Sequence, residues 1–312
     1  MPSPPLAAEL KLFGPQAAHS KPLSLRQSRR YCRRFARRHY ENFTVVSWAL
    51  PWRLRPHFYS IYAYCRWADD LADETADRRE SLALLAWWEQ QLHECIQGRA
   101  THPVFIALGD TIRRYAIPAD PFVDLLVAFR QDQQVTRYET FDQLLNYCRY
   151  SAVPVGRLVL YLAQCHTPQR VRLADAVCTG LQLANFWQDV ARDYARGRIY
   201  IPMAHCRRFG YLEADFARGE ANDNFRHLLA AEVAEAEGFL RRGLPLVDLM
   251  PKHLRLDVAL FIEGGLAILE AIRQQNYDVW TKRPALSRKQ KLQLVLRCWW
   301  QLRRGTFHRE KS

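Results

Sequence analysis

Two pairs of aspartates, each with a spacing of four residues, constrain most strongly what this chain can fold into. The first pair is Asp69 and Asp73, and the second is Asp189 and Asp193. On an α-helix, residues i and i+4 lie on the same face with Cβ atoms about 5–6 Å apart, so each pair can direct two carboxylates at one point. Two such helices facing each other would form an oxygen-rich site for hard divalent cations. Because Mg²⁺ in such sites normally holds phosphates, the pattern predicts a phosphate-binding Mg²⁺ centre.

The composition allows a sizeable hydrophobic core, because 49% of the 312 residues are hydrophobic. The eight cysteines are scattered without a C-x-x-C pair, which favours buried free thiols over a zinc site or a disulfide framework. No stretch approaches the roughly 20 apolar residues of a membrane span, and the N-terminus does not resemble a secretory signal. We therefore expect a cytoplasmic protein, either soluble or peripheral to a membrane.

The formal net charge is +13, and the basic residues are concentrated in two stretches. The first has helical spacing and comprises Arg26, Arg29, Arg30, Arg33, Arg34, Arg37 and Arg38. The second surrounds Trp299 and Trp300 and comprises Arg297, Arg303, Arg304, Arg309 and Lys311. No nucleic-acid-binding motif accompanies this charge, so we expect no nucleic acid partner. The aromatics favour an anionic membrane, at the inner face of a bacterial inner membrane, or a polyanionic substrate; a solvated basic face without a partner is the alternative.

Hydrophobic periodicity predicts helices over nearly the whole chain. Leu85, Trp88 and Leu92, for example, recur at intervals of three and four residues, as in an amphipathic helix. Residues 1–22 contain several prolines and are interpreted as a flexible lead-in, and alternating strand patterns are almost absent. The prediction is a single all-α domain over residues 23–312, ending in a basic, Trp-containing tail.

Further motifs accompany the aspartate pairs. They are Tyr40-Glu41-Asn42-Phe43, Ser47-Trp48, Leu54-Arg55-Pro56-His57-Phe58, Cys65-Arg66-Trp67-Ala68-Asp69-Asp70, Tyr147-Cys148-Arg149-Tyr150-Ser151-Ala152, Asn185-Phe186-Trp187-Gln188-Asp189 and Gly197-Arg198-Ile199-Tyr200-Ile201-Pro202. Together they resemble the squalene and phytoene synthase family of head-to-head prenyl synthases, from about Ser24 to Arg288, and within it the bacterial hydroxysqualene synthases of hopanoid biosynthesis. The resemblance implies an all-α, single-domain isoprenoid (terpenoid) synthase helical bundle with a central active-site cavity. It also implies a Mg²⁺ requirement and a prenyl diphosphate substrate.

The resemblance implies roles for the polar residues of the motifs. The implied Mg²⁺ ligands are Asp69, Asp73, Asn185, Asp189 and Asp193. Arg66 is similar to a residue that binds the diphosphate, and Arg198 and Lys282 are further candidates, with surface charge as their alternative. Asp70 and Glu74 are interpreted as flanking carboxylates that tune the local charge or face solvent.

The resemblance also implies roles for aromatic and small residues. Tyr200 and Tyr147 are catalytic candidates, Tyr200 because it resembles a family tyrosine at the catalytic centre; a core tyrosine with a satisfied hydroxyl is its alternative. The positions that match the lining of a hydrocarbon cavity are Phe43, Tyr62, Tyr147 and Phe186. At Gly156 and Ala152 a small side chain would let two helices or a substrate chain approach closely. The other substrate-binding candidates are His39, Tyr40, Asn42 and Gln182.

Two departures from the condensing members bear on the reaction. Those relatives commonly have His-Ser-Lys-Ser-Phe where this chain has His39-Tyr40-Glu41-Asn42-Phe43, so that an acid replaces a lysine suited to a second diphosphate. Glu263-Gly264-Gly265 occupies a helix on which relatives often place a tyrosine against the reacting intermediate. An enzyme that acts on one diphosphate and admits water would tolerate both changes. We therefore predict Mg²⁺-dependent conversion of presqualene diphosphate and water to hydroxysqualene and diphosphate, with Glu41 orienting the water or, alternatively, serving as an ordinary helix-end carboxylate.

Two other functions are considered. A condensing synthase would join two farnesyl diphosphates into presqualene diphosphate or a carotenoid-type product. A family member with only an assembly or scaffold role would typically lose ligand carboxylates, whereas all four are present here. The predicted reaction implies a functional link to a presqualene diphosphate synthase. No G-x-G-x-x-G motif indicates a nicotinamide cofactor.

Overall fold

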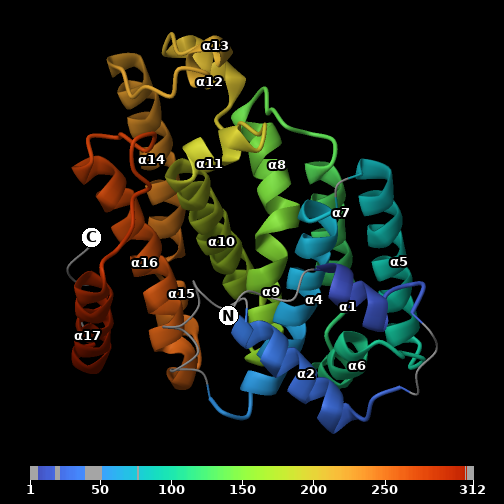
Figure 1. Cartoon of the computed structure of the whole chain (residues 1–312). Helices are drawn as coiled ribbons and strands as arrows, with labels where there is room; N and C mark the ends of the chain where they lie inside the picture. Colours follow the sequence, from blue (N-terminus) through green and yellow to red (C-terminus); the bar gives the residue numbers. More distant parts are fainter. Residues whose placement is uncertain (1–5, 18–21, 39–50, 76, 306, 308–312) are drawn as a thin grey trace. The chain divides into compact units, whose positions relative to one another are not determined.

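The structure is a computed structural model that describes residues 6–17, 22–38, 51–75, 77–305 and 307 (Figure 1). Across these residues the regular elements are helices, and β pairing is limited to an isolated parallel bridge between Arg137 and Ile199. The predicted all-α fold is confirmed. None of the helices in the described ranges is both long enough and apolar enough to cross a membrane. The chain divides into two compact units, Met1–Gln134 and Val135–Ser312.

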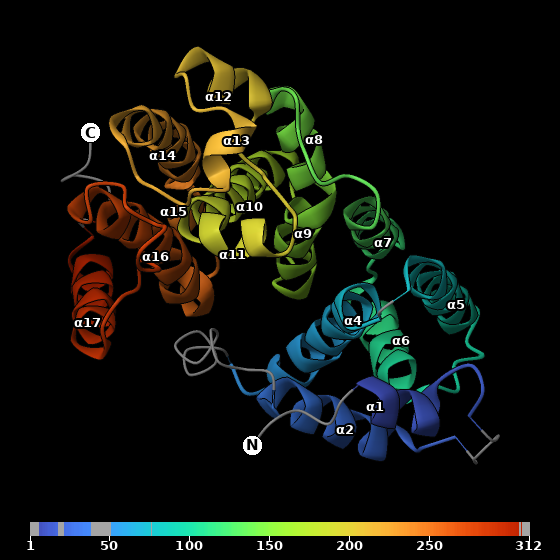
Figure 2. The same cartoon turned by 45° about the horizontal axis from the view of Figure 1, so that its top comes forward.

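The first unit is built from six described helices (Figure 2). They are α1 (Leu6–Phe13), α2 (Leu25–Arg38), α4 (Arg55–Asp73), α5 (Arg78–Ile96), α6 (Pro103–Tyr115) and α7 (Asp120–Asp132). Three of them carry a proline in their first turn, where the missing N–H has no intrahelical partner to lose. Helices α2, α4 and α6 pack against one another and form the centre of the unit.

Helix α1 lies within the stretch that the sequence predicted to be a flexible lead-in, and that prediction is wrong for residues 6–13. Leu6 and Glu9 share one face of α1 and are both buried. The hydroxyl of Tyr31 in α2 donates a hydrogen bond of 2.8 Å to the Glu9 carboxylate, and Trp67 Nε1 donates to the same hydroxyl at 3.0 Å. A buried carboxylate that accepts a hydrogen bond can hold a short helix in place. The prolines on which the prediction of a flexible lead-in was based give no information about such a contact.

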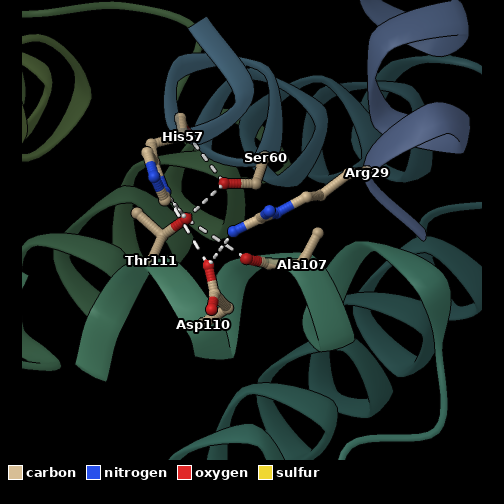
Figure 3. A network of polar contacts seen from close by, with 6 residues as sticks. All are labelled: Arg29, His57, Ser60, Ala107, Asp110 and Thr111. Carbon is tan, nitrogen blue, oxygen red and sulfur yellow. Dashed lines mark hydrogen bonds and ion pairs between the residues drawn. The ribbon is translucent and has the colours of Figure 1, made fainter. Parts of the chain in front are cut away.

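A polar network joins α2, α4 and α6 (Figure 3). Arg29 of α2 donates to Asp110 of α6 at 2.7 Å. The hydroxyl of Thr111 lies 2.9 Å from both His57 Nδ1 and the Ser60 hydroxyl of α4. Burial lowers the pKa of His57, so the imidazole is neutral at physiological pH and acts as a hydrogen-bonding group. The network therefore fixes the relative positions of the three central helices.

The core of the first unit is rich in stacked aromatic rings. The rings of Trp67 and Trp88 are stacked with centroids 5.1 Å apart and an interplanar angle of 10°. His102 stands edge-on to both indoles, at 4.9 and 5.0 Å. Its Nδ1 accepts a hydrogen bond of 3.2 Å from the N–H of Val104, so His102 also caps the N-terminus of α6. Burial lowers the pKa of His102 to about 3.

This buried histidine predicts a pH-dependent loss of stability. Below the ordinary pKa of 6.5 the unfolded chain binds a proton at His102, whereas the folded chain stays neutral until the pH approaches about 3. The contribution of His102 to the free energy of unfolding is thus fully present at neutral pH and falls as the pH is lowered. Between about pH 7.5 and about pH 5.5 the contribution is a loss of about 1.4 kcal/mol. Urea unfolding of the wild type and of His102→Asn, which keeps a capping acceptor but does not titrate, should differ by this amount; equal losses in both proteins would contradict the prediction.

The second unit contains the remaining helices (Figures 1 and 2). They are α8 (Phe141–Ser151), α9 (Val153–Leu162), α10 (Pro168–Gln188), α11 (Val190–Ala195), α12 (Met203–Arg208), α13 (Glu213–Phe216), α14 (Asp223–Gly243), α15 (Leu246–Leu249), the 3-10 helix η1 (Lys252–Leu254), α16 (Arg255–Gln274) and α17 (Arg288–Arg304). Side chains that accept a backbone hydrogen bond cap α8, α10, α14 and α17, namely Thr140, Thr167, Asn222 and Ser287.

Glycines allow α10 and α14 to pack closely at the centre of the second unit. A Cβ on Gly180 of α10 would meet Leu240 of α14 at 2.8 Å, and Gly243 of α14 lies against Val177 of α10. Helix α16 packs on both helices, and α17 packs on α16. The close contact fixes α10, whose C-terminal end leads into the second aspartate pair.

Candidate active site

The first aspartate pair lies in the last two turns of α4. The Asp69 carboxylate is 40% exposed and accepts a hydrogen bond of 2.8 Å from Arg66. Asp73, one turn later, is also exposed. Tyr62, one turn before Arg66, is half-buried, and burial raises its pKa to about 12. The end of α4 thus presents two accessible carboxylates, a guanidinium and a protonated phenol on successive turns.

Asp70 differs from the carboxylates of Asp69, Asp73 and Glu74 because it is buried. The expectation that Asp70 faces solvent is therefore wrong. Arg66 contacts the Asp70 carboxylate at 2.6 Å and the exposed Glu74 at 3.8 Å. Burial raises the pKa of Asp70 to about 7, although the guanidinium of Arg66 acts in the opposite direction. Asp70 therefore pairs with Arg66 through a buried carboxylate, and its role in tuning the charge of the cluster stays a prediction.

The second aspartate pair lies where α10 ends and α11 begins. The sequence predicted one continuous helix here, but Asp189 has φ −107° and ψ 15°, which interrupts the α-helix. The backbone N–H of Asp193 still donates to the carbonyl of Asp189 at 2.9 Å, and that of Asp189 to Asn185 at 3.0 Å. The spacing of one turn between Asn185, Asp189 and Asp193 is therefore retained in spite of the break. Asn185 is exposed.

Arg283 holds Asp189 of the second pair and was not predicted from the sequence, which pointed to its neighbour Lys282. Its guanidinium donates to both carboxylate oxygens of Asp189, at 2.6 and 2.7 Å, and to the Gln188 side chain at 2.9 Å. Gln188 in turn donates to the carbonyl of Pro284 at 2.5 Å. Hydrogen bonding to Asp189 raises the pKa of Arg283. Lys282 is exposed, and no sequence signal distinguished the two basic residues, because Asp189 lies 94 positions away.

Four predicted site residues line one small pocket in the second unit: Phe186, Asp193, Arg198 and Tyr200. The remaining lining residues are apolar, namely Val190, Ile199, Ile201 and Phe216. A carboxylate, a guanidinium and a phenol therefore meet an otherwise apolar wall. In this structure the pocket has room for about one water molecule.

A cluster of buried aromatic rings adjoins this pocket. Tyr200 stacks on Phe186 with ring centroids 3.9 Å apart and an interplanar angle of 12°. The Tyr147 ring lies 6.1 Å from Phe186 and 5.9 Å from Tyr200, so three predicted residues come together. Tyr138 completes the cluster, 5.8 Å from Tyr200, and was not predicted. It is brought there by the isolated bridge between residues 137 and 199, which a sequence pattern does not reveal.

The predicted small residues lie around α9. A Cβ on Gly156 would meet the Sγ atom of Cys178 in α10 at 2.6 Å, so the close helix approach expected there is present. Ala152 is buried at the joint between α8 and α9, and Gln182 is half-buried on α10, one turn before Phe186. The predicted residues His39, Tyr40, Glu41, Asn42 and Phe43 lie outside the described residues.

The predicted metal ligands suit Mg²⁺, because their side chains supply carboxylate and amide oxygens. They are Asp69, Asp73, Asn185, Asp189 and Asp193. Within the described part of the chain, no group of three or more His, Cys, Asp or Glu side chains gathers as a ready-made metal site. Each aspartate pair by itself offers two carboxylates. That number fits Mg²⁺, which usually keeps several waters and binds through one or two carboxylates and the substrate phosphates.

The sequence and the fold are similar to those of known proteins. The profile of the squalene/phytoene synthase family matches residues 36–290. A hydroxysqualene synthase from Zymomonas mobilis is 32% identical over 244 residues, 76% of this chain and 80% of that protein. A phytoene synthase from Arthrospira platensis is 29% identical over 275 residues, 84% of this chain and 89% of that protein. The crystal structure of squalene synthase HpnC from Alicyclobacillus acidocaldarius has a TM-score of 0.79 and 46% identity, covering 81% of this chain and 96% of that one.

The chain belongs to the squalene/phytoene synthase family, and the predicted family is confirmed. Its fold is the helical fold of that family, as the crystal structure of a dehydrosqualene synthase in complex with ligand also indicates, with a TM-score of 0.82 and 27% identity over 90% of this chain and 98% of that one. Enzymes of this family act on prenyl diphosphates in head-to-head reactions and use divalent metal ions to bind the diphosphate.

The contacts of Arg283 predict its contribution to stability. Arg283→Met keeps an apolar stem but leaves Asp189 and the buried Gln188 without the guanidinium, so we expect the free energy of unfolding to fall by about 2 kcal/mol. Lys282→Met is the matched control, because Lys282 is exposed, and it should change stability by less than about 0.5 kcal/mol. Urea unfolding followed by circular dichroism measures both; equal losses would contradict the assignment of the contact to Arg283.

Proposed function

We propose that this enzyme ionises presqualene diphosphate and that water captures the rearranged cation, giving hydroxysqualene. The observation that carries the proposal is the segment Glu263-Gly264-Gly265 in α16, which has no hydroxyl side chain. The similarity to a hydroxysqualene synthase over 76% of the chain supports it. The sequence segment Tyr40-Glu41-Asn42, in which an acid stands where condensing relatives have a lysine, supports it as well.

The three residues of this segment have different surroundings. The Glu263 carboxylate is buried and accepts a hydrogen bond of 2.9 Å from Arg297 of α17, so it is engaged at the contact between α16 and α17. A Cβ on Gly265 would meet Leu181 and Leu240 at 2.8 and 2.9 Å, which leaves no room for a tyrosine there. Gly264 has open space instead, with no atom within 4 Å of a Cβ placed on it. We infer that this space admits the attacking water.

The polar residues would stabilise the leaving group. Asp69, Asp73, Asp189 and Asp193, with Asn185, would hold Mg²⁺, which supplies positive charge to the departing diphosphate. Arg66 and Arg198 would bind diphosphate oxygens directly, and Lys282 is a further candidate. A guanidinium suits this task because it presents several fixed donors and keeps its charge. As the carbon–oxygen bond breaks, the electron pair leaves with the diphosphate and the carbon skeleton becomes a cation.

The apolar residues would protect that cation until water arrives. The faces of Tyr147, Phe186 and Tyr200 offer π electrons, and Phe43 and Tyr62 are proposed to extend the same lining. Glu41 is proposed to orient the water and to take its proton as the new carbon–oxygen bond forms. Ala152, Gly156, Gln182, His39, Tyr40 and Asn42 are proposed to shape the binding site around the substrate. We further propose that the reaction takes place in the cytoplasm and that another synthase supplies presqualene diphosphate.

The product tests this proposal. Purified protein incubated with presqualene diphosphate and Mg²⁺, without nicotinamide, should give the alcohol hydroxysqualene. In ¹⁸O-labelled water the hydroxyl should carry the label, because water rather than the diphosphate oxygen forms the new bond. Heat-denatured protein serves as the control for spontaneous solvolysis. Recovery of squalene, or of unreacted substrate, would contradict the proposal.

The alternative is a condensing synthase that joins two farnesyl diphosphates. The similarity to phytoene synthases, at 29% identity over 84% of the chain in one case, favours it. Feeding farnesyl diphosphate alone separates the two functions. Release of diphosphate would favour condensation, whereas an enzyme restricted to presqualene diphosphate should leave farnesyl diphosphate intact.

The aspartates should be essential for turnover under either function. Asp69→Asn and Asp189→Asn each remove one negative charge at nearly constant shape, and we expect kcat to fall at least about 100-fold. Glu220→Gln, which alters an exposed carboxylate, is the matched control and should retain activity. Circular dichroism should show the same helical content in all variants. Turnover within about twofold of the wild type in either aspartate variant would contradict the metal assignment.

A further inference from the structure

Helix α17 has an outward face that the rest of the second unit does not cover. The helix has well-defined ends, because Ser287 and Gln290 form a capping box at its start and Gly305 ends it in the left-handed conformation with φ 64°. It packs on α16 through the buried Cys298 and the Arg297–Glu263 ion pair. In Figures 1 and 2 it lies at the edge of the unit, beside α16.

The outward face carries a row of large apolar side chains. Leu292, Leu296 and Trp300 are 60%, 51% and 52% exposed, and Trp299 is also exposed. Leu292, Leu296 and Trp300 recur every four residues on the side of the helix that faces away from the buried Cys298, and Trp299 lies at the edge of that side. Single exposed apolar residues are common on proteins, but a continuous row marks an interaction surface. We call these four residues the α17 apolar row.

The charge around the row is entirely positive. The helix carries Arg288, Lys289, Lys291, Arg297, Arg303 and Arg304, and it contains no acidic residue. The guanidinium of Arg303 lies 4.1 Å from the Trp299 ring centroid, and that of Arg304 lies 4.9 Å from the Trp300 ring centroid. The charged ends of these two arginines thus lie over the indole rings, so basic charge accompanies the tryptophans directly.

We propose that α17 docks flat on an anionic lipid bilayer, with the α17 apolar row inserted and the basic residues at the headgroup phosphates. Leucines and tryptophans opposite the packing face, with lysines and arginines beside them, form the pattern of interfacial amphipathic helices. Tryptophan prefers the interfacial region, where one side of its ring system is apolar and the other is wet. With 17 residues the helix is about 25 Å long, which gives an extended contact parallel to the surface.

Helix α2 shows why the basic charge alone does not carry this inference. Arg30, Arg33 and Arg37 are exposed on α2, on one side of the helix. Its exposed surface, however, lacks a row of large apolar side chains, because the buried face takes up Tyr31 and Phe35. In α17 the apolar and basic residues share the exposed side, and this combination fits a bilayer better than nucleic acid or a purely electrostatic partner.

Vesicle co-sedimentation tests the proposal without any substrate. The wild type should bind vesicles of phosphatidylcholine with about 30 mol% phosphatidylglycerol, bind pure phosphatidylcholine much more weakly, and lose affinity as salt is raised. Trp299→Ala/Trp300→Ala should lower the partition coefficient at least about tenfold. Trp52→Ala is the matched control, because Trp52 is 72% exposed and also has an arginine, Arg53, over its ring, but lies outside α17. It should bind within about twofold of the wild type.

A second variant tests the charge separately. Lys289→Glu/Lys291→Glu keeps the α17 apolar row and should lose the preference for phosphatidylglycerol. Retained binding by both α17 variants, or an equal loss in the Trp52 control, would overturn the proposal. So would a wild type that stays in the supernatant and forms a dimer that Trp299→Ala/Trp300→Ala dissociates, because the row would then bind a second copy. None of these outcomes depends on turnover, so they are independent of the proposed function.

Discussion

The clustering of carboxylates is the constraint on which the candidate site depends, because like charges a few ångströms apart repel unless a cation lies beside them. Each unit places an arginine in that position. Arg66 contacts Asp69 and Asp70 at 2.8 and 2.6 Å, and Arg283 binds both oxygens of Asp189. The two arginines place positive charge beside carboxylates that would otherwise repel one another. Within each unit the carboxylates of the candidate site are thus paired with positive charge.

The apolar side begins one turn away from this charge. Phe186 precedes Asp189 by three residues on α10, and its ring stacks on Tyr200 at 3.9 Å. The bridge between Arg137 and Ile199 anchors the segment that carries Tyr200, and the aromatic cluster closes around it. The short distance between charged and apolar residues suits an enzyme that must release an anion and keep a carbocation in the same place. In a site of this kind the π faces can stabilise the cation without offering a nucleophile of their own.

Local patterns in the sequence predicted those features of the structure that depend on residues close together in the chain. The helices, the turn-by-turn spacing of the aspartates and the motif residues Tyr147, Phe186 and Tyr200 all follow from periodicity or from resemblance. Contacts between distant segments were not predictable. Arg283 reaches Asp189 across 94 positions, and it stands next to Lys282, which has the same charge and no contact with the aspartate. The break at Asp189 and the packing of α1 through Glu9 likewise depend on tertiary contacts rather than on local propensity.

The basic residues of the chain fall into two groups, those paired with carboxylates in the candidate site and those on exposed helical surfaces. Arg66 and Arg283 are paired with carboxylates within the site, and each such pair of opposite charges adds nothing to the net charge of +13. The excess lies instead on exposed helical surfaces, above all on α2 and α17. Rows of like charges at a spacing of four residues weaken an isolated helix, so such rows are favoured where an anionic partner offsets the repulsion. Basic residues at this spacing lie on α2, whereas those of α17 accompany exposed tryptophans and leucines, for which a diphosphate has no use. The diphosphate and the basic surface of α17 therefore answer different requirements, the first for the chemistry of the family and the second for the bilayer docking that we propose.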